Sequence, residues 1–380
     1  MSVSHLLFTP NTVSIYVESD SIDPGPACFN STVPTVPNSE VKKLETMFFL
    51  VVIAVIAVAV SAQDDNVWSC ISLQSSSLLD DLVTWSTLNC TSDPSTAPIQ
   101  TVNVISIDAL ASDKVRIIPA VAVNDAKVQS IPEMATQDDK FIAGINGGYF
   151  WRVDVDGFWF DDVCREKVRK EANLPANPMT PNTGVSDGLV KVDGKVLGSN
   201  CNCTGYSRPA VAILNGKDSS IQVLHRGETV ERSVQNAIGA GPNLVSYDST
   251  TGQSFIDIPS DDDNINILEH AANTAIAFIF DPSNPSVVSK TLLVTTDGSD
   301  ECGPLQEGCG LNAKNFASFL KDYLKVSVAM SMDQGGSTTM WVKQQAANGR
   351  NGVVSRSHNT DPVENDGPRS VANGVFVQLL

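Results

Sequence analysis

The sequence predicts an α+β fold, a single mixed-sheet domain with few helices. From Ile99 onward, short apolar runs rich in Val, Ile, Ala and Thr alternate with Gly, Pro, Asn and Asp, a pattern typical of β-strands and turns. Residues 311–325 form the clearest helix pattern, with Phe316, Phe319 and Leu320 on one face. No repeat recurs along the chain, which excludes a solenoid.

The chain is acidic, and this narrows its classes of function. Its 380 residues carry a formal net charge of -18, and 42% of them are hydrophobic, enough to bury a core. Nucleic-acid binding is disfavoured because it needs a basic face. An anionic substrate would therefore need local cations or backbone N–H donors at its site.

The N-terminal segment has the order of a secretory leader. Residues 1–46 are polar and without periodicity, and we interpret them as a disordered upstream extension, with Met47 as the true start. Residues 47–62 are predicted to be a signal peptide, because Lys42 and Lys43 precede a short apolar run that ends on small residues. A signal anchor is the alternative. We expect a secreted protein, or one in the lumen of the Golgi or lysosome, with no membrane span after cleavage.

Cysteines and sequons agree with secretion. All eight cysteines except Cys28 follow the predicted cleavage point, so disulfides are expected. The expected bridges are Cys70–Cys90, Cys302–Cys309, and Cys164 with Cys201 or Cys203. Asn89 and Asn202 begin glycosylation sequons, which favour surface loops. The spacing of Cys201 and Cys203 is too tight for a zinc knuckle, and we predict neither a metal nor a cofactor.

The elements follow in order along the mature chain. Residues 63–98 are predicted to be an N-terminal helical lead, with a helix over Ser77–Leu88 that carries a stripe of Leu, Val and Trp. Residues 99–380 form the main domain. Strands are predicted at 101–107, 114–123, 141–145, 208–214, 221–225, 274–280, 291–296, 326–332 and 369–380, with a hairpin turning at Asp193-Gly194.

Two aspartates stand where chemistry is expected. Asp297 and Asp333 each follow a hydrophobic strand and precede glycine-containing backbone. Paired carboxylates serve glycosidic cleavage, one as acid and the other as nucleophile or base. Asp-Gly is also ordinary turn chemistry, and this alternative is strongest for Asp297. It is weaker for Asp333, because the crowded segment "DQGGSTT" (333–339) follows that strand end.

Glycines and a few cations surround these positions. Gly147-Gly148 and Gly335-Gly336 allow backbone N–H groups to approach a ligand closely. Arg208 and Arg369 precede strands, and an arginine suits phosphate because its planar fork donates two hydrogen bonds. His270 lies before another strand.

In this order the segments "INGGYF" (145–150), "NAIGAGPNLV" (236–245), "TTDG" (295–298), "MDQGGSTTMWV" (332–342) and "RSVANGVFV" (369–377) resemble the phosphodiester glycosidase family. The resemblance covers roughly 99–380. It implies a phosphodiester glycosidase-like catalytic domain that hydrolyses the bond between a sugar's anomeric carbon and a phosphodiester, as in a GlcNAc-1-phosphodiester. The partner is then a phosphoglycan or glycoprotein substrate.

The resemblance implies a site lined by Asn146, Gly147, Gly148, Asp297, Asp333, Gly335, Gly336, Ser337 and Arg369. We assign the roles, and add further residues, from the chemistry of the side chains. Asp333 is assigned as nucleophile or general base, and Asp297 as a second acid/base or orienting carboxylate. Arg369 and Arg208 are assigned to the phosphate. The residues expected to bind substrate are Asn146, Gly147, Gly148, Arg208, His270, Gly335, Gly336, Ser337, Thr338 and Arg369.

Two positions depart from the family's pattern. Gln334 stands where the motif usually has glycine, and Asn273 or Ala272 stands where the run H-P-R-T-A-I-G has arginine. Two alternatives therefore remain open. One is a catalytically weakened phosphoglycan-binding protein of the same fold. The other is a hydrolase of a polysaccharide phosphodiester.

Overall fold

The computed structural model describes residues 2–9, 12–18, 68–92, 99–123, 128–152, 182–186, 188–197, 210–223, 230–258, 270–299, 310–345, 349–358 and 368–380. The chain divides into two units, 1–65 and 66–380. In the first unit, β1 (Ser2–Thr9) and β2 (Thr12–Glu18) pair antiparallel. This hairpin differs from the disordered extension predicted over 1–46, because its Val, Ile, Tyr and Thr content favours strands. The predicted signal peptide lies outside the described residues.

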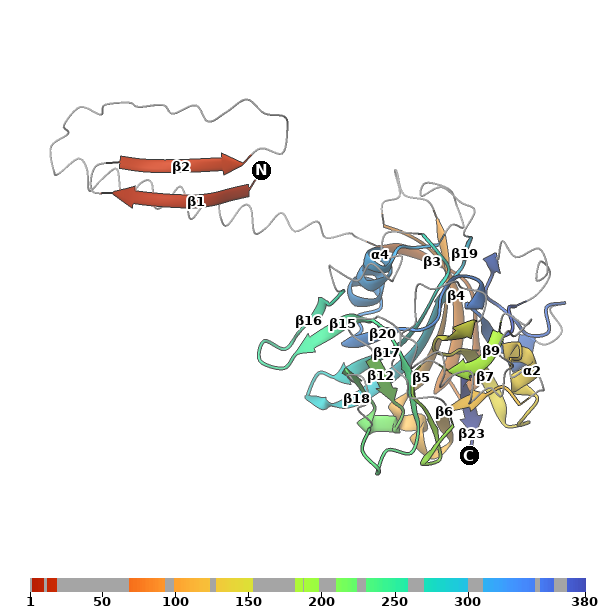
Figure 1. The fold of residues 1–380 in the computed structure, drawn as a ribbon. Helices are drawn as coiled ribbons and strands as arrows, with labels where there is room; N and C mark the ends of the chain where they lie inside the picture. The colour runs from red at the N-terminus through yellow and green to blue at the C-terminus, as the bar shows by residue number, and fades with distance from the viewer. Residues whose placement is uncertain are drawn as a thin grey trace, which may run out of the picture. The chain divides into compact units, whose positions relative to one another are not determined.

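An eight-stranded antiparallel sheet is the main layer of the second unit (Figure 1). Each neighbouring pair in it runs antiparallel. Its strands, in spatial order, are β16 (Gln253–Ile256), β15 (Asn243–Asp248), β20 (Val328–Ser331), β17 (Asn273–Asp281), β18 (Asn284–Thr296), β5 (Gln100–Asp108), β4 (Val83–Thr91) and β3 (Ser69–Leu79).

Two further antiparallel sheets and two short strand pairs complete this unit. The four-stranded sheet has the order β21 (Met340–Val342), β7 (Phe141–Asn146), β23 (Asn373–Leu379), β6 (Val115–Val121). The five-stranded sheet has the order β11 (Lys195–Val196), β10 (Val190–Val192), β14 (Ala237–Ala240), β12 (Ala210–Ile213), β13 (Ser220–Val223). The pairs are β8 (Phe150–Arg152) with β9 (Asn182–Ser186), and β19 (Gly298–Ser299) with β22 (Ser357–His358).

One hydrophobic core joins the three sheets. Ile105 and Phe278 from the eight-stranded sheet, Ile145 and Val375 from the four-stranded sheet, and Ile238 from the five-stranded sheet belong to the same buried cluster, each fully buried. Burying this much apolar surface from all three sheets in one place is the main force that holds the layers together.

Short helices cover the outer faces of the sheets. α4 (Ala313–Ser318) continues into a π-helical turn, η3 (Phe319–Tyr323), and packs its Phe and Leu side chains on the eight-stranded sheet. α2 (Ile131–Ala135) covers the four-stranded sheet. The two helices lie on opposite sides of the unit (Figure 1). Short 3₁₀ turns occur at η1 (Ala109–Asp113), η2 (Gly216–Asp218), η4 (Gly335–Ser337) and η5 (Lys343–Gln345).

The helix predicted over 311–325 is confirmed, with a later start. The Asn312 side chain accepts a hydrogen bond from the Asn315 backbone N–H at 2.8 Å, which caps the helix at that point. Leu311 lies outside the helix and pairs with Ala271 in an isolated bridge.

The helix predicted over Ser77–Leu88 is wrong. β3 and β4 form a hairpin there, and Asp80 and Asp81 take positive φ at its turn. Val83 and Trp85 are both buried and lie two residues apart, which is the period of a strand rather than of a helix. The strand forms because β4 pairs with β5 as well as with β3. The same hairpin makes the predicted Cys70–Cys90 disulfide, whose two cysteines face each other in the ladder. The other predicted bridges lie outside the described residues.

The fold is therefore predominantly β with few helices, as the strand-rich pattern indicates. The mixed sheet is not what the structure has. Within the described ranges, only β19 with β22 is parallel. Asn89 lies inside β4 rather than in a surface loop. Among the described residues, no helix has the length and hydropathy needed to span a bilayer.

Candidate active site

The two predicted carboxylates lie at the same end of the eight-stranded sheet, where neighbouring strands begin or finish; we call this end the sheet edge. Asp297 follows β18 directly, and Asp333 comes two residues after β20. β18 and β20 flank β17 and both run antiparallel to it. Both strands therefore end beside the start of β17, where Asn273 faces Thr296 and Ala275 faces Ser331. The topology brings together two residues that are far apart in the sequence.

Asn146, at the end of β7, binds this edge to the four-stranded sheet. Its side-chain oxygen accepts from the Thr274 hydroxyl at 2.7 Å and from the Thr339 backbone N–H at 3.0 Å. Its side-chain nitrogen donates to the Asp333 carbonyl at 2.8 Å and to the Gly147 carbonyl at 3.4 Å. Asn146 is completely buried, and these bonds use its full capacity of two donors and two acceptor sites. It positions the Asp333 turn and has no group left for substrate.

The glycines at 147 and 148 serve close contacts within the protein. The Gly147 N–H donates to the Asn373 carbonyl at 2.9 Å, and its own carbonyl accepts from the Asp333 N–H at 3.1 Å. A Cβ on Gly148 would come within 2.1 Å of the Gly239 carbonyl oxygen. Only glycine fits there.

The turn after Asp333 explains why a side chain is tolerated at Gln334. Gln334 has extended backbone, with φ -117° and ψ -176°, which any residue adopts. The left-handed conformation belongs to Gly335, with φ 61°. The Gln334 N–H donates to the Asp333 carboxylate at 2.9 Å, and its side chain donates to the Ser331 hydroxyl at 3.2 Å. The departure from the family's glycine therefore leaves the turn intact.

Asp297 is the more deeply buried of the two carboxylates. It is 8% exposed, and its carboxylate accepts from the Asn103 side chain at 3.2 Å and from the Arg356 backbone N–H at 2.8 Å. Burial raises the pKa of Asp297 to about 6, and the Arg356 N–H bond together with the charges of Arg356 and Arg350 opposes this rise. Asp297 is thus poised to hold or release a proton near neutral pH, whereas Asp333 is only half-buried.

Three glycines pack closely against the turn Ala271-Ala272, next to the segments that carry Asp297 and Asp333. The Gly335 N–H donates to the Ala272 carbonyl at 2.9 Å. A Cβ on Gly298 would come within 2.2 Å of the Ala272 nitrogen, and one on Gly310 within 1.9 Å of the Ala271 oxygen. The turn Ala271-Ala272 is therefore a common floor for the segments that carry Asp297 and Asp333.

The hydroxyl residues after Asp333 lie below the surface. Ser337 is completely buried, and Thr338 is 1% exposed. In the described part of the chain, the side-chain oxygens of both residues are without a hydrogen-bond partner. Both side chains therefore lie beneath the surface of the turn, and their role in binding substrate stays a prediction.

The remaining predicted residues are placed differently. His270 is half-buried, and its Nδ1 lies 3.1 Å from the Gly310 carbonyl, so the neutral ring carries its proton on Nδ1. Arg369 is half-buried and lies four residues before Asn373, the first residue of β23. Arg208 lies outside the described residues.

Sequence reasoning missed the segment 349–358. It runs beside β21, where the Val354 N–H donates to the Met340 carbonyl at 2.9 Å, and then reaches Asp297. β22 pairs with β19, with Ser357 facing Gly298. The segment "NGRNG" (348–352) looks like an ordinary turn. Neither its arginine, Arg350, nor Arg356 further on gave a signal of a site until the fold brought this segment to Asp297.

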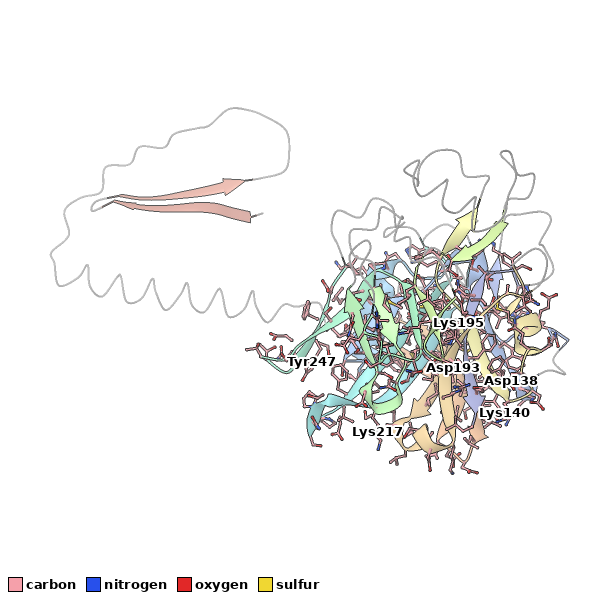
Figure 2. The ribbon with its side chains drawn as sticks, turned by 60° about the horizontal axis from the view of Figure 1, so that its bottom comes forward. Asp138, Lys140, Asp193, Lys195, Lys217 and Tyr247 are labelled. Carbon is pink, nitrogen blue, oxygen red and sulfur yellow. A yellow bond between two sulfur atoms is a disulfide. The ribbon has the colours of Figure 1, made fainter. Side chains whose placement is uncertain are left out.

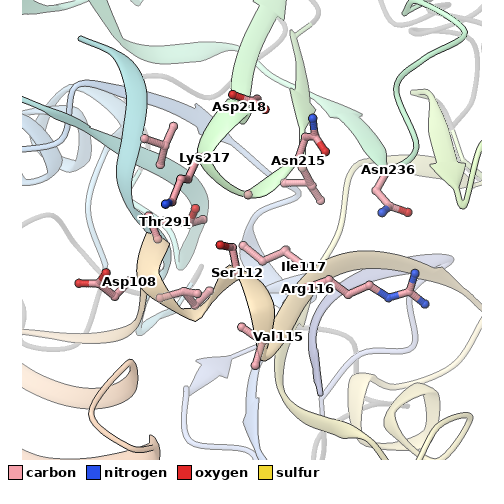
Figure 3. Close-up of a pocket in the computed structure, with 15 residues that line it drawn as sticks. Asp108, Ser112, Val115, Arg116, Ile117, Asn215, Lys217, Asp218, Asn236 and Thr291 are labelled. Atoms are coloured by element: carbon pink, nitrogen blue, oxygen red, sulfur yellow. The ribbon is translucent and has the colours of Figure 1, made fainter. Parts of the chain in front are cut away.

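The described residues also line a cavity of about 370 Å³ between η1 and η2 (Figure 3). Its wall includes Asp108, the last residue of β5, and Thr291 of β18, which pairs with the neighbouring Ile107. Six residues along β18 separate Thr291 from Asp297, roughly 20 Å at about 3.3 Å per residue. This cavity is therefore distinct from the carboxylate site.

The fold and the site together describe a predominantly β protein that carries two aspartates at the same sheet edge. The family model for phosphodiester glycosidases matches residues 139–378, and the chain belongs to this family. A comparison of the chain with curated protein sequences found no match.

Solved structures are similar to the chain at low sequence identity. A hypothetical protein from Synechocystis is 14% identical at a TM-score of 0.44, over 79% of this chain and 62% of that one. The chain thus spans less than two thirds of that protein's length. The zebrafish N-acetylglucosamine-1-phosphodiester α-N-acetylglucosaminidase catalytic domain, auto-inhibited by its pro-peptide, is 15% identical at a TM-score of 0.48, over 82% of this chain and 88% of that one.

Proposed function

We propose that the protein is a hydrolase that cleaves the bond between a sugar's anomeric carbon and a phosphodiester, with a GlcNAc-1-phosphodiester-like substrate. The observation that carries the proposal is the pair Asp297 and Asp333, held at one sheet edge in unlike environments. Two carboxylates whose environments differ can divide the acid and base roles of glycosidic cleavage.

The proposed reaction needs few groups. The bond between the anomeric carbon and the phosphate oxygen breaks, and its electron pair leaves with the phosphomonoester. Asp333 acts either as nucleophile or as the base that removes a proton from water, and the water oxygen ends on the anomeric carbon. Asp297, with a pKa of about 6, gives a proton to the leaving oxygen or orients the water. Because phosphate is already a good leaving group, the acid contributes less than in ordinary glycosides.

The compartment proposed for this reaction is the secretory pathway lumen or the exterior of the cell. The Cys70–Cys90 disulfide supports it, because such bonds persist in oxidising environments. The proposed partner is a phosphoglycan or a phosphoglycan-bearing glycoprotein.

The test is sugar release by the purified full chain. GlcNAc-1-phosphodiesters, other sugar-1-phosphodiesters and polysaccharide phosphodiester fragments are incubated with it at pH 5, 6 and 7. Release from the GlcNAc substrate is expected. Release from the polysaccharide fragments alone would favour the polysaccharide hydrolase. Saturable binding of every substrate without release would favour the weakened binding protein.

A further inference from the structure

We propose that Arg356, assisted by Arg350, forms the cationic subsite that binds the substrate's phosphate beside Asp297. The inference rests on the proposed function for the identity of the ligand. Its basis in the molecule is the position of the segment 349–358, which lies between the two aspartate motifs.

The position of Arg356 is fixed by its own backbone. Its N–H donates to the Asp297 carboxylate at 2.8 Å, and its carbonyl accepts from the Gly298 N–H at 3.1 Å. The next residue, Ser357, donates from its hydroxyl to the Gly336 carbonyl at 3.4 Å. Arg356 is thus tied to the Asp297 motif on one side and is adjacent to the Asp333 loop on the other. Its side chain is exposed, so a ligand can reach it.

Arg350 is held on a rigid turn close by. The Trp341 indole N–H donates to the Asn351 carbonyl at 3.0 Å, and the Val342 N–H donates to the Gly352 carbonyl at 2.9 Å. Gly349 and Gly352 take positive φ of 78° and 86°, which lets the chain turn tightly around the arginine. The turn is therefore anchored to β21 rather than free to move away.

The charges of Arg350, Arg356 and Asp297 interact electrostatically. Partial burial and the like charge of Arg356 lower the pKa of Arg350, and the Asp297 carboxylate opposes that change. Both arginines therefore contribute positive charge in the neighbourhood of the buried Asp297 carboxylate. In a chain whose net charge is -18, an anionic substrate needs cations of this kind at its site.

The family-pattern position for an arginine does not compete for this role. Asn273 is 1% exposed, and its side-chain nitrogen donates to the Leu311 carbonyl at 2.6 Å and the Ala271 carbonyl at 2.8 Å. Both of its N–H donors are therefore committed to the backbone. The proposed cation of this site therefore comes from the segment 349–358.

A phosphodiester fits the arrangement chemically. Its phosphate carries one negative charge before cleavage and gains a second as the phosphomonoester leaves. An arginine fork donates two parallel hydrogen bonds to such oxygens. Placed beside the acid Asp297, the same cation binds the substrate and stabilises the charge that develops on the leaving group.

Paired substrates test the assignment. The full chain, Arg356→Ala, Arg356→Lys, Arg350→Ala and the matched control Arg232→Ala are assayed with a GlcNAc-1-phosphodiester and with an aryl N-acetylglucosaminide that lacks phosphate. We expect Arg356→Ala to lower kcat/KM for the phosphodiester by about 10- to 100-fold, since the bond is to a charged group. The aryl substrate should change less than about twofold, with Arg350→Ala weaker and Arg356→Lys intermediate. An equal loss on both substrates, or no loss on either, would overturn the proposal.

A binding measurement separates this proposal from the proposed function. Calorimetric titration with GlcNAc-1-phosphate and with GlcNAc alone needs no turnover. If the wild type releases no sugar from any substrate, the proposed function fails, and the subsite is still decided here. Phosphate-dependent affinity that falls in Arg356→Ala but persists in Arg232→Ala supports the subsite. Affinity unchanged by Arg356→Ala, or absent from the wild type, refutes it.

Discussion

Asn103 donates a hydrogen bond to Asp297 across 194 residues of sequence, at 3.2 Å. Asn103 is completely buried in β5, and its own oxygen accepts from the Thr87 hydroxyl on β4 at 2.8 Å. The Asp297 N–H also donates to the Thr101 carbonyl of β5 at 2.9 Å. β5 precedes the segment 139–378 matched by the family model. The candidate acid is thus held by a strand outside that segment.

Removing the Asn103 donor should raise the pKa of Asp297 above about 6. The bond stabilises the ionised carboxylate, so Asn103→Leu favours the protonated form. Carboxyl-carbon NMR titration of Asp297 measures the change directly, and the corresponding limb of the pH–rate profile should move to higher pH. Thr87→Val, which keeps the amide donor, is the control and should leave the titration in place. A downward movement in Asn103→Leu would refute the assigned role.

Asp297→Asn should stabilise the fold above neutral pH. The folded pKa of about 6 lies above the ordinary 3.8, so between these values the folded state holds more protons than the unfolded state. Stability therefore falls as pH rises through this window, and above it the ionised carboxylate costs about 3 kcal/mol. Asparagine keeps an oxygen for the Arg356 N–H and carries no charge.

The free energy of unfolding in urea at pH 4 and pH 8 measures this effect. At pH 8 the variant should exceed the wild type by up to about 3 kcal/mol, and at pH 4 by much less, because Asp297 is then mostly protonated in the folded state. A difference that does not change with pH would contradict the burial of an ionisable group at this position. Asp113→Asn, at the exposed end of η1, is the control.

Asp333→Asn should abolish most sugar release. If Asp333 is the nucleophile or general base, the neutral amide lowers kcat by about 10²- to 10⁴-fold. The fold should persist, because Asn keeps the oxygen that accepts from the Gln334 N–H. Single-turnover assays with the phosphodiester, together with thermal unfolding, check both expectations. Activity within about threefold of the wild type would remove Asp333 from the chemistry.

The sequence predicts those parts of the site that are set by a few neighbouring residues, and not those that depend on pairing with distant strands. Asp297 and Asp333 were predictable, because each ends an apolar strand and a strand end is readable from a few residues. The β3–β4 hairpin was not, because the Leu and Trp spacing in 78–85 suits a helix as well as a strand. Pairing with β5 decides between them.

The supporting residues needed the fold itself. Asn103 is the one amide side chain in the strand-like run 101–107. An amide between two valines is a usable signal of a buried hydrogen-bond partner, although it does not name Asp297. Arg356 gave no such signal, since an arginine in a loop is ordinarily a solvated surface residue. Its role follows only from the β19–β22 pairing.

Asn146 makes the most demanding structural prediction, because one side chain there joins β7, β17 and the Asp333 turn. Asn146→Ala removes all of its bonds and leaves the Thr274 hydroxyl and the Thr339 N–H buried without this partner. We expect a loss of about 3 to 5 kcal/mol in the free energy of unfolding. Thr274→Val removes only the hydroxyl bond and should cost about 1 kcal/mol. Urea unfolding of both variants makes the comparison. Equal losses would show that Asn146 does not act as the junction of these segments.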